Sequence, residues 1–178
     1  MSSLRITAGT LRGRRVPVPQ GEVRPTSERA RQAYFNIVGD RIEGARFLDL
    51  FAGSGIFTFE ALSRGAGSAT AIDRNITTIA RTAAQFGIIV NAIAGEVLAV
   101  LKRLTDSFDL VYADPPYAYD RYDELVAAIA RVAPGALVAV EHRRHTSPFN
   151  RGPEPFRTEE YGEVRITFFK PSLPQELQ

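Results

Sequence analysis

The 178-residue sequence contains no cysteine, which excludes disulfide bonds and metal sites built from thiolates. It also has no apolar run long enough to cross a bilayer, and its basic N-terminus lacks the apolar segment of a secretory signal. We therefore expect a soluble, cytoplasmic protein with no membrane partner. Because 44% of the residues are hydrophobic, the chain can bury a core, most simply as one domain with a small appendage.

Charge is unevenly distributed along the chain, although the formal net charge is only +2. The first 31 residues hold seven arginines and two glutamates, so the remainder is net negative. Basic charge concentrated at one end is expected when one element binds a polyanion. The arginines predicted to contact that polyanion are Arg12, Arg14, Arg15, Arg24, Arg29 and Arg31.

The N-terminal segment predicts a hairpin-like arm. Residues 4–19 form two short extended runs around glycine-containing turns, and Pro17 and Pro19 prevent a regular central strand. We predict that this arm, residues 1–22, is not a core element, so that deleting residues 1–20 should leave the fold intact. The main domain would then span residues 23–178.

A helix is predicted next, over residues 28–38. Thr26 or Ser27 can cap its start, and Gly39 can close it. Its apolar positions recur at helical spacing, and Arg29 and Arg31 are expected on its other face.

From residue 46 onward, strand and helix signals alternate, as a mostly parallel sheet requires. The predicted strands lie near residues 46–50, 69–73, 88–93, 108–113 and 136–141. The predicted helices lie near residues 54–64, 75–86, 96–104 and 121–131. Two final runs, 156–161 and 164–170, are separated by Gly162-Glu163 and predict an antiparallel hairpin. The fold class is therefore α/β.

The first chemical motif is RFLDLFAGSG, residues 46–55, a short apolar strand that breaks into a glycine-rich turn. Gly53 and Gly55 lack the β-carbon that would keep a ligand away from the backbone. In an open α/β sheet, ligands lie beyond the carboxyl ends of the strands, which is where this turn falls. The motif therefore predicts a ligand-binding loop.

The spacing from Gly53 to Asp73 also fits a dinucleotide site, but Thr58 stands where the third glycine would fall. Asp49 would repel a pyrophosphate, whereas it is well placed to accept hydrogen bonds from an ammonium group. Asp73 could hold both hydroxyls of a ribose or cap the next helix, and Glu96 could bind an adenine amine or favour a helix N-terminus. The predicted ligand-binding residues are Asp49, Phe51, Ala52, Gly53, Gly55, Asp73, Arg74, Glu96 and Val97.

The second motif is DPPY, which ends the fourth predicted strand. Its prolines fix the backbone, so that the Pro115 carbonyl and the Asp114 carboxylate form two neighbouring acceptors. Such a pair can hold both N–H groups of an exocyclic base amine, aim the nitrogen lone pair at an electrophilic methyl group and stabilise the charge that develops. Tyr117 offers a ring on which the base can stack. The alternative is a rigid strand exit, and the residues predicted to be catalytic are Asp114, Pro115, Pro116 and Tyr117.

Two histidines follow the last parallel strand. His142 and His145, with Glu141, could suggest a metal or a general base, but their spacing fits a strand end that leads into a polar loop. We therefore expect solvated residues and no metal site. Arg143 and Arg144 could extend a polyanion-binding surface or simply be solvated.

Five blocks of sequence together resemble a known family. They are RITAGTLRGRR at 5–15, RPTSERARQAYFN at 24–36, DLFAGSG at 49–55, EALSRGA at 60–66 and DPPY at 114–117, and they resemble the RsmD family of 16S ribosomal RNA guanine methyltransferases. Two positions depart from the family pattern: Gln32-Ala33, where an acid is frequent, and Gly95-Glu96, where the residue beside the adenine varies.

The resemblance implies a Rossmann-like class I methyltransferase fold with a mostly parallel seven-stranded sheet, a C-terminal antiparallel hairpin and an N-terminal hairpin arm. It implies S-adenosylmethionine as the cofactor and the N2 amine of a guanine in small-subunit ribosomal RNA, as naked RNA or within a 30S particle, as the acceptor. The two motifs would bind the cofactor and the amine, respectively, and the arginines would bind the RNA.

Other functions remain open from the sequence. A DNA adenine-N6 methyltransferase would use the same DPPY motif on a flipped base, but no separate domain is present to recognise a DNA sequence. A protein glutamine methyltransferase would not need seven N-terminal arginines. A non-catalytic RNA-binding assembly factor with the same fold would not need an intact DPPY motif.

Overall fold

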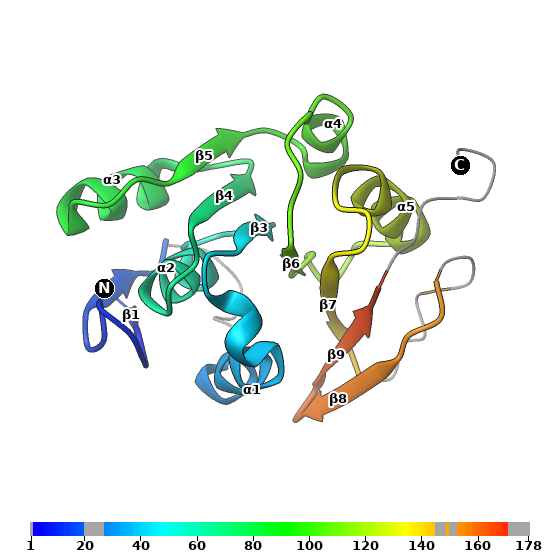
Figure 1. Ribbon diagram of the computed structural model, residues 1–178, viewed down its shortest axis with the longest axis horizontal. Coiled ribbons are helices and arrows are strands. Elements are labelled where there is room, and N and C mark those ends of the chain that lie inside the picture. The colour runs from blue at the N-terminus through cyan, green and yellow to red at the C-terminus, as the bar shows by residue number, and fades with distance from the viewer. Residues whose placement is uncertain (1, 20–26, 145–148, 150–152, 171–178) are drawn as a thin grey trace.

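A computed structural model describes residues 2–19, 27–144, 149 and 153–170, and it confirms the α/β class (Figure 1). The N-terminal elements are β1 (Ser3–Arg5), β2 (Arg15–Pro17), α1 (Glu28–Val38) and the 3-10 helix η1 (Gly39–Ile42). The alternating part comprises β3 (Arg46–Leu50), α2 (Ile56–Ser63), β4 (Ser68–Asp73), α3 (Thr77–Phe86), β5 (Asn91–Ala94), α4 (Val97–Leu101), β6 (Leu110–Ala113), α5 (Tyr122–Val132) and β7 (Leu137–Arg143). The chain then forms β8 (Arg157–Tyr161) and β9 (Val164–Phe169).

The central sheet has seven strands in the order β5-β4-β3-β6-β7-β9-β8. Its five alternating strands are parallel, whereas β9 runs antiparallel to β7 and pairs with β8 as the predicted hairpin. Strand β5 begins at Asn91, later than residue 88, where we expected it. The reason is the end of α3: the Gly87 and Ile88 amides still bond the carbonyls of Ala84 and Ala83, so the chain is turning there rather than extended.

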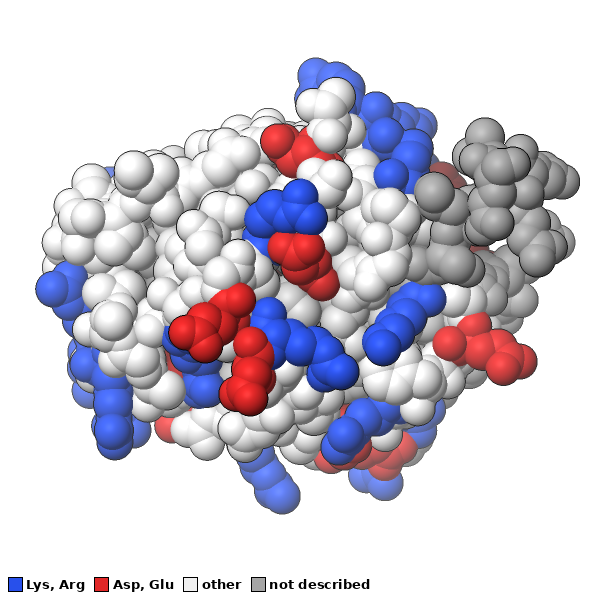
Figure 2. All heavy atoms as spheres, in the orientation of Figure 1, with Lys and Arg blue, Asp and Glu red and all other residues white. Residues whose placement is uncertain are grey.

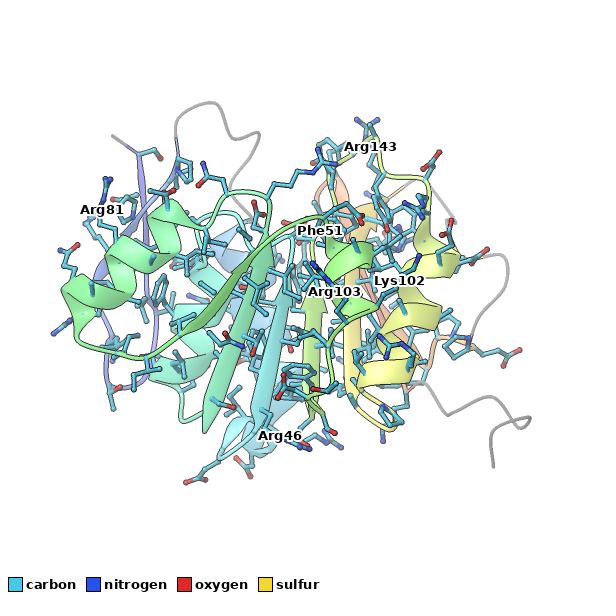
Figure 3. All side chains as sticks on the ribbon, turned by 90° about the horizontal axis from the view of Figure 1, so that it is seen from above. Arg46, Phe51, Arg81, Lys102, Arg103 and Arg143 are labelled. Carbon is cyan, nitrogen blue, oxygen red and sulfur yellow. The ribbon has the colours of Figure 1, made fainter. Side chains whose placement is uncertain are left out.

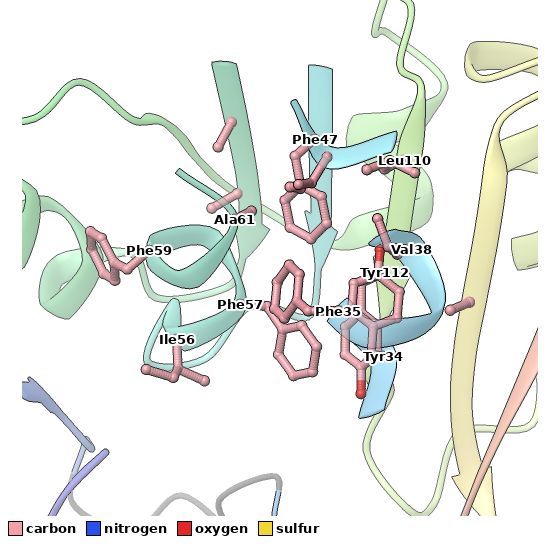
Figure 4. Packing of buried hydrophobic residues seen from close by; sticks show 14 of the residues in the cluster. Tyr34, Phe35, Val38, Phe47, Ile56, Phe57, Phe59, Ala61, Leu110 and Tyr112 are labelled. Carbon is pink, nitrogen blue, oxygen red and sulfur yellow. The ribbon is translucent and has the colours of Figure 1, made fainter. Parts of the chain in front are cut away.

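Helices cover both faces of the sheet, and each layer buries its own apolar cluster (Figure 1). Helices α1, α2 and α3 contribute to one cluster, and α4 and α5 to the other. Figure 4 shows the first cluster, in which the Phe57 ring stacks on Tyr112 at a centroid distance of 3.6 Å while Tyr34 meets Tyr112 edge-on at 5.0 Å. This packing fixes the carboxyl end of β6, where the DPPY motif begins.

The N-terminal hairpin forms as predicted, with β1 and β2 antiparallel, but the expectation that it lies outside the core is wrong. Ile6, Leu11 and Val16 are buried in the same cluster as α1 and α2. The hairpin also approaches α2 closely, because a β-carbon on Gly9 would lie 1.7 Å from the Ser63 carbonyl oxygen. Deleting residues 1–20 would therefore expose core side chains rather than leave the fold intact.

Arg31 also departs from the prediction, because its side chain is fully buried and cannot lie on a surface that contacts RNA. Its Nε atom donates to Glu60 at 3.3 Å and its Nη2 atom donates to the Arg5 carbonyl at 2.7 Å. Arg64 and the Thr7 amide also bond Glu60. The hairpin covers this side of α1, so a side chain that helical spacing places on a polar face becomes part of the interior.

Candidate active site

A pocket of about 630 Å³ lies where both sequence motifs meet. Strands β3 and β6 are neighbours in the sheet, and the Asp114 amide bonds the Leu50 carbonyl at 3.2 Å. Figure 3 shows Phe51 beyond the carboxyl end of β3, with Arg46 at the opposite end of that strand. The predicted residues that line the pocket are Asp49, Phe51, Ala52, Gly53, Asp73, Arg74, Glu96, Val97, Asp114, Pro115, Pro116 and Tyr117.

Gly55 is the one predicted ligand-binding residue outside the pocket lining, and its role is structural. It precedes α2 with a φ of 78°, and a β-carbon there would lie 2.9 Å from the Ile79 side chain. Glycine is thus required at this position for the turn and for the packing of α2 against α3.

Asp49 is buried, and Thr58 holds its carboxylate. Both the amide and the hydroxyl of Thr58 donate to Asp49 Oδ2, at 3.0 and 2.6 Å. Burial raises the pKa of Asp49 to about 7, although the Thr58 hydrogen bonds oppose the shift. Thr58, which stands where a dinucleotide motif has its third glycine, therefore positions the Asp49 carboxylate. This carboxylate favours a ligand that is positively charged at this end of the pocket.

Asp73 and Glu96 both line the pocket; Glu96 also makes the helix-terminus contact considered from the sequence, whereas Asp73 does not cap α3, whose N-cap residue is Ile76. The two carboxylate oxygens of Asp73 accept from the amides of Gly53 and Asn75, each at 3.0 Å. Glu96 caps α4 by accepting from the Ala99 amide at 2.8 Å. Asp73 thus ties the glycine-rich loop to the end of β4, which keeps its carboxylate at the pocket wall.

Phe51 and Tyr119 connect the two motif loops. Phe51 has a φ of 60°, a backbone conformation that non-glycine residues seldom adopt, and its ring meets Tyr119 edge-on at 5.3 Å. The Tyr119 hydroxyl is buried without a hydrogen-bond partner among the described residues, and Tyr119 lines the pocket. Sequence reasoning missed Tyr119; its only signal was its position two residues after the DPPY motif.

Tyr117 lies at the pocket mouth and is 38% exposed. The Arg143 guanidinium carbon lies 4.4 Å from the centroid of its ring, in cation–π contact. Figure 3 places Arg143 at the same end of the sheet as Phe51. Arg143 is therefore exposed but packed on a ring of the DPPY motif, rather than simply solvated.

Glu141 and His142 are buried, so the expectation that they are solvated is wrong. The Tyr112 hydroxyl donates to Glu141 Oε2 at 2.5 Å, and His142 Nε2 lies 2.8 Å from the Thr167 hydroxyl. Burial lowers the pKa of His142, which favours a neutral ring. Glu141 also lines the pocket, so the pocket reaches past β6 to the neighbouring strand β7. His145 lies outside the described residues.

The predicted RNA-binding arginines divide into three groups. Arg12, Arg14, Arg15 and Arg29 are exposed, and Figure 2 shows basic side chains gathered at the lower left, over the N-terminal hairpin. Arg14 packs over the Phe86 ring at 5.0 Å, so part of its side chain is committed to α3. Arg31 is buried, and Arg24 lies outside the described residues.

The described part of the chain has neither a cluster of metal ligands nor a membrane-spanning helix. No group of three or more His, Cys, Asp or Glu side chains there could hold a metal ion. No helix in that part is long and apolar enough to span a membrane.

The parallel sheet with its C-terminal hairpin, and the pocket at the strand ends, define a Rossmann-like methyltransferase. The chain belongs to the RsmD family: a family model described as Conserved hypothetical protein 95 matches residues 4–170. It is 34% identical to the Escherichia coli (strain K12) protein "Ribosomal RNA small subunit methyltransferase D", over 78% of this chain and 74% of that protein.

Two other similar proteins cover nearly the whole chain. The Bacillus subtilis (strain 168) protein "Putative rRNA methyltransferase YlbH" is 29% identical, over 94% of this chain and 98% of that protein. The solved structure "Putative methyltransferase yhhF from Escherichia coli" superposes with a TM-score of 0.82 at 27% identity, covering 97% of this chain and 100% of that one.

Proposed function

We propose that the protein transfers a methyl group from S-adenosylmethionine to the N2 amine of a guanine in small-subunit ribosomal RNA, working in the cytoplasm on a ribonucleoprotein particle or its RNA. The observation that carries the proposal is that the glycine-rich loop after β3 and the DPPY motif after β6 line one pocket. A methyl donor and an amine can therefore meet there. The names of the curated relatives support the choice of ribosomal RNA.

The donor half of the pocket suits S-adenosylmethionine. Asp49 would accept hydrogen bonds from its ammonium group, and Asp73 would accept from its ribose hydroxyls. Asp49 is a buried carboxylate with a raised pKa, and a nearby cation stabilises the ionised form of such a group. This property supports the assignment of Asp49 to the ammonium group. When bound, S-adenosylmethionine supplies an electrophilic methyl group on a positively charged sulfur.

The DPPY residues would then prepare the guanine. The Asp114 carboxylate and the Pro115 carbonyl hold the two N–H groups of the amine, which lets its nitrogen present a lone pair. The same carboxylate stabilises the positive charge that develops on N2, and one N2 proton is released to water after the transfer. Tyr117 provides a ring face for stacking, worth roughly 1–3 kcal/mol per base, and Arg143 lies against that ring.

Methyl transfer from tritiated S-adenosylmethionine to small subunits from a strain that lacks the enzyme tests this proposal. We expect label in the small-subunit RNA, and mapping of the product base should identify N2-methylguanine. Parallel reactions with naked RNA and with duplex DNA identify the form of the substrate. Label in DNA adenine, or no turnover of the donor by the folded protein, would contradict the proposal.

The affinity for S-adenosylmethionine should depend on pH through Asp49. Its pKa is raised to about 7 in the free protein, so the carboxylate becomes protonated as the pH falls below that value and loses its attraction for the ammonium group. We expect the affinity to fall progressively from pH 8 to pH 5.5, and Asp49→Asn to bind more weakly with a flatter profile. Calorimetry across this range measures both, and equal profiles for the two proteins would rule out the ammonium contact.

The exposed arginines of the hairpin should contribute to RNA affinity through phosphate contacts. Because Arg14 is partly committed to Phe86, the cleaner variant is Arg12→Gln combined with Arg15→Gln. We expect weaker RNA binding and a salt dependence that is shallower by up to about one unit of log–log slope per arginine. The matched control is Arg103→Gln, because Arg103 is also an exposed arginine but lies on the layer of α4 and α5. Equal slopes for the double variant and the wild type would show that Arg12 and Arg15 do not contact the RNA.

A further inference from the structure

We propose that Glu141 recognises the target guanine by accepting a hydrogen bond from its N1–H group, and so makes the pocket select guanine over bases whose N1 is unprotonated. The inference rests on the proposed function, because it assigns a residue to the acceptor base of that reaction. It goes beyond the DPPY motif, which can hold the amine of more than one base.

Glu141 lies beside the residue that would hold the amine. Strands β6 and β7 are parallel neighbours in which Ala113 pairs with Val140, so Asp114, which directly follows β6, and Glu141 of β7 are the next residues along the two segments. Both line the same pocket. A base whose N2 amine meets Asp114 can therefore direct the adjacent atom of its Watson–Crick edge, N1, towards Glu141.

Tyr112 holds the Glu141 carboxylate in place. Its hydroxyl donates to Glu141 Oε2 at 2.5 Å, and its ring is clamped by stacking on Phe57 at 3.6 Å. The pKa of Tyr112 is raised well above its ordinary value, mainly by burial and secondly by the nearby charge of Glu141. The hydroxyl therefore remains a donor. A carboxylate has about four acceptor sites, so it can accept from Tyr112 and from a base at the same time.

The hydrogen-bonding properties of the Glu141 carboxylate and of the base edge determine which base is preferred. An ionised carboxylate only accepts hydrogen bonds. Guanine presents N1–H and N2–H groups side by side, which match two neighbouring carboxylates. Adenine and 2-aminopurine present an N1 lone pair, which a carboxylate would repel. Leu4, Val18 and Val164 also line the pocket, and such apolar neighbours strengthen the effect of an unmatched polar group.

The test compares guanine with 2-aminopurine, which keeps the 2-amine but lacks the N1 proton. Small subunits are reconstituted on RNA that carries one or the other base, introduced by ligation of a synthetic fragment, at the position mapped as methylated. We expect the wild type to prefer guanine by about 100-fold in kcat/KM. In Glu141→Gln the amide can turn to donate to N1, so the preference should fall to within about 10-fold.

Three controls separate base recognition from structural damage. Glu141→Gln should bind S-adenosylmethionine within twofold of the wild type. Tyr112→Phe, which removes only the positioning hydroxyl, should show an intermediate preference. Glu163→Gln, in the exposed turn between β8 and β9, should leave the preference unchanged.

Two results would overturn the inference. One is a loss of methylation in Glu141→Gln by the same factor on both bases, and the other is a wild type that methylates both bases equally. A wild type that methylates no guanine would instead refute the proposed function itself, so the two failures are distinguishable.

Discussion

Replacing Asp114 with Ala is expected to reduce the rate of methyl transfer by about 100- to 1000-fold, as is typical when a preorganised electrostatic contact to a reacting group is lost. The affinity for S-adenosylmethionine should stay within a few fold, because the donor half of the pocket depends on Asp49, Asp73 and the glycine-rich loop. Single-turnover kinetics with labelled donor measure the rate, and calorimetry measures the affinity.

Two further variants sharpen this test. Asp114→Asn keeps one acceptor oxygen and the shape of the side chain, so it should retain more activity than Asp114→Ala. Tyr117→Phe keeps the ring that stacks on the base and should lose little. Near-normal turnover of Asp114→Ala would show that the carboxylate does not hold the amine, and the role of the DPPY motif would then be only to end β6.

The second large effect concerns stability: Arg31→Ala should lower the free energy of unfolding by about 3–5 kcal/mol. Arg31 and Glu60 are both fully buried and joined at 3.3 Å, so the substitution removes one of the two guanidiniums that bond Glu60, takes the donor from the Arg5 carbonyl and leaves a cavity beside a buried carboxylate. For a chain of this length, the loss corresponds to a fall in Tm of about 10 °C. Thermal and urea unfolding, followed by circular dichroism, measure both quantities.

Arg29→Ala is the matched control, because Arg29 lies on the same helix but is exposed. Its effect on stability should stay within about 0.5 kcal/mol, and any loss should appear in RNA affinity instead. If Arg31→Ala were as stable as Arg29→Ala, the bonds from Arg31 to Glu60 and to the Arg5 carbonyl would not stabilise the fold.

The order of the elements and the location of the pocket followed from the sequence by local reasoning. Apolar runs of strand length alternate with helical spacing, and that alternation requires a parallel sheet. A glycine-rich turn and a DPPY motif that each end a strand must lie on the same edge of such a sheet. The predicted ligand-binding and catalytic residues therefore line one pocket, with Gly55 the exception.

The sequence by itself thus determined the fold class, the site edge and the residue types available there, because these depend on patterns within short segments. Only the tertiary structure decided that Arg31 is buried, that the hairpin shares the core, and that Glu141 stands beside Asp114. Arg31 meets Glu60, and Tyr112 meets Glu141, across 29 residues of sequence in each case. Local periodicity cannot report such contacts, because packing between separate elements determines whether a charged side chain faces water, a partner or a pocket.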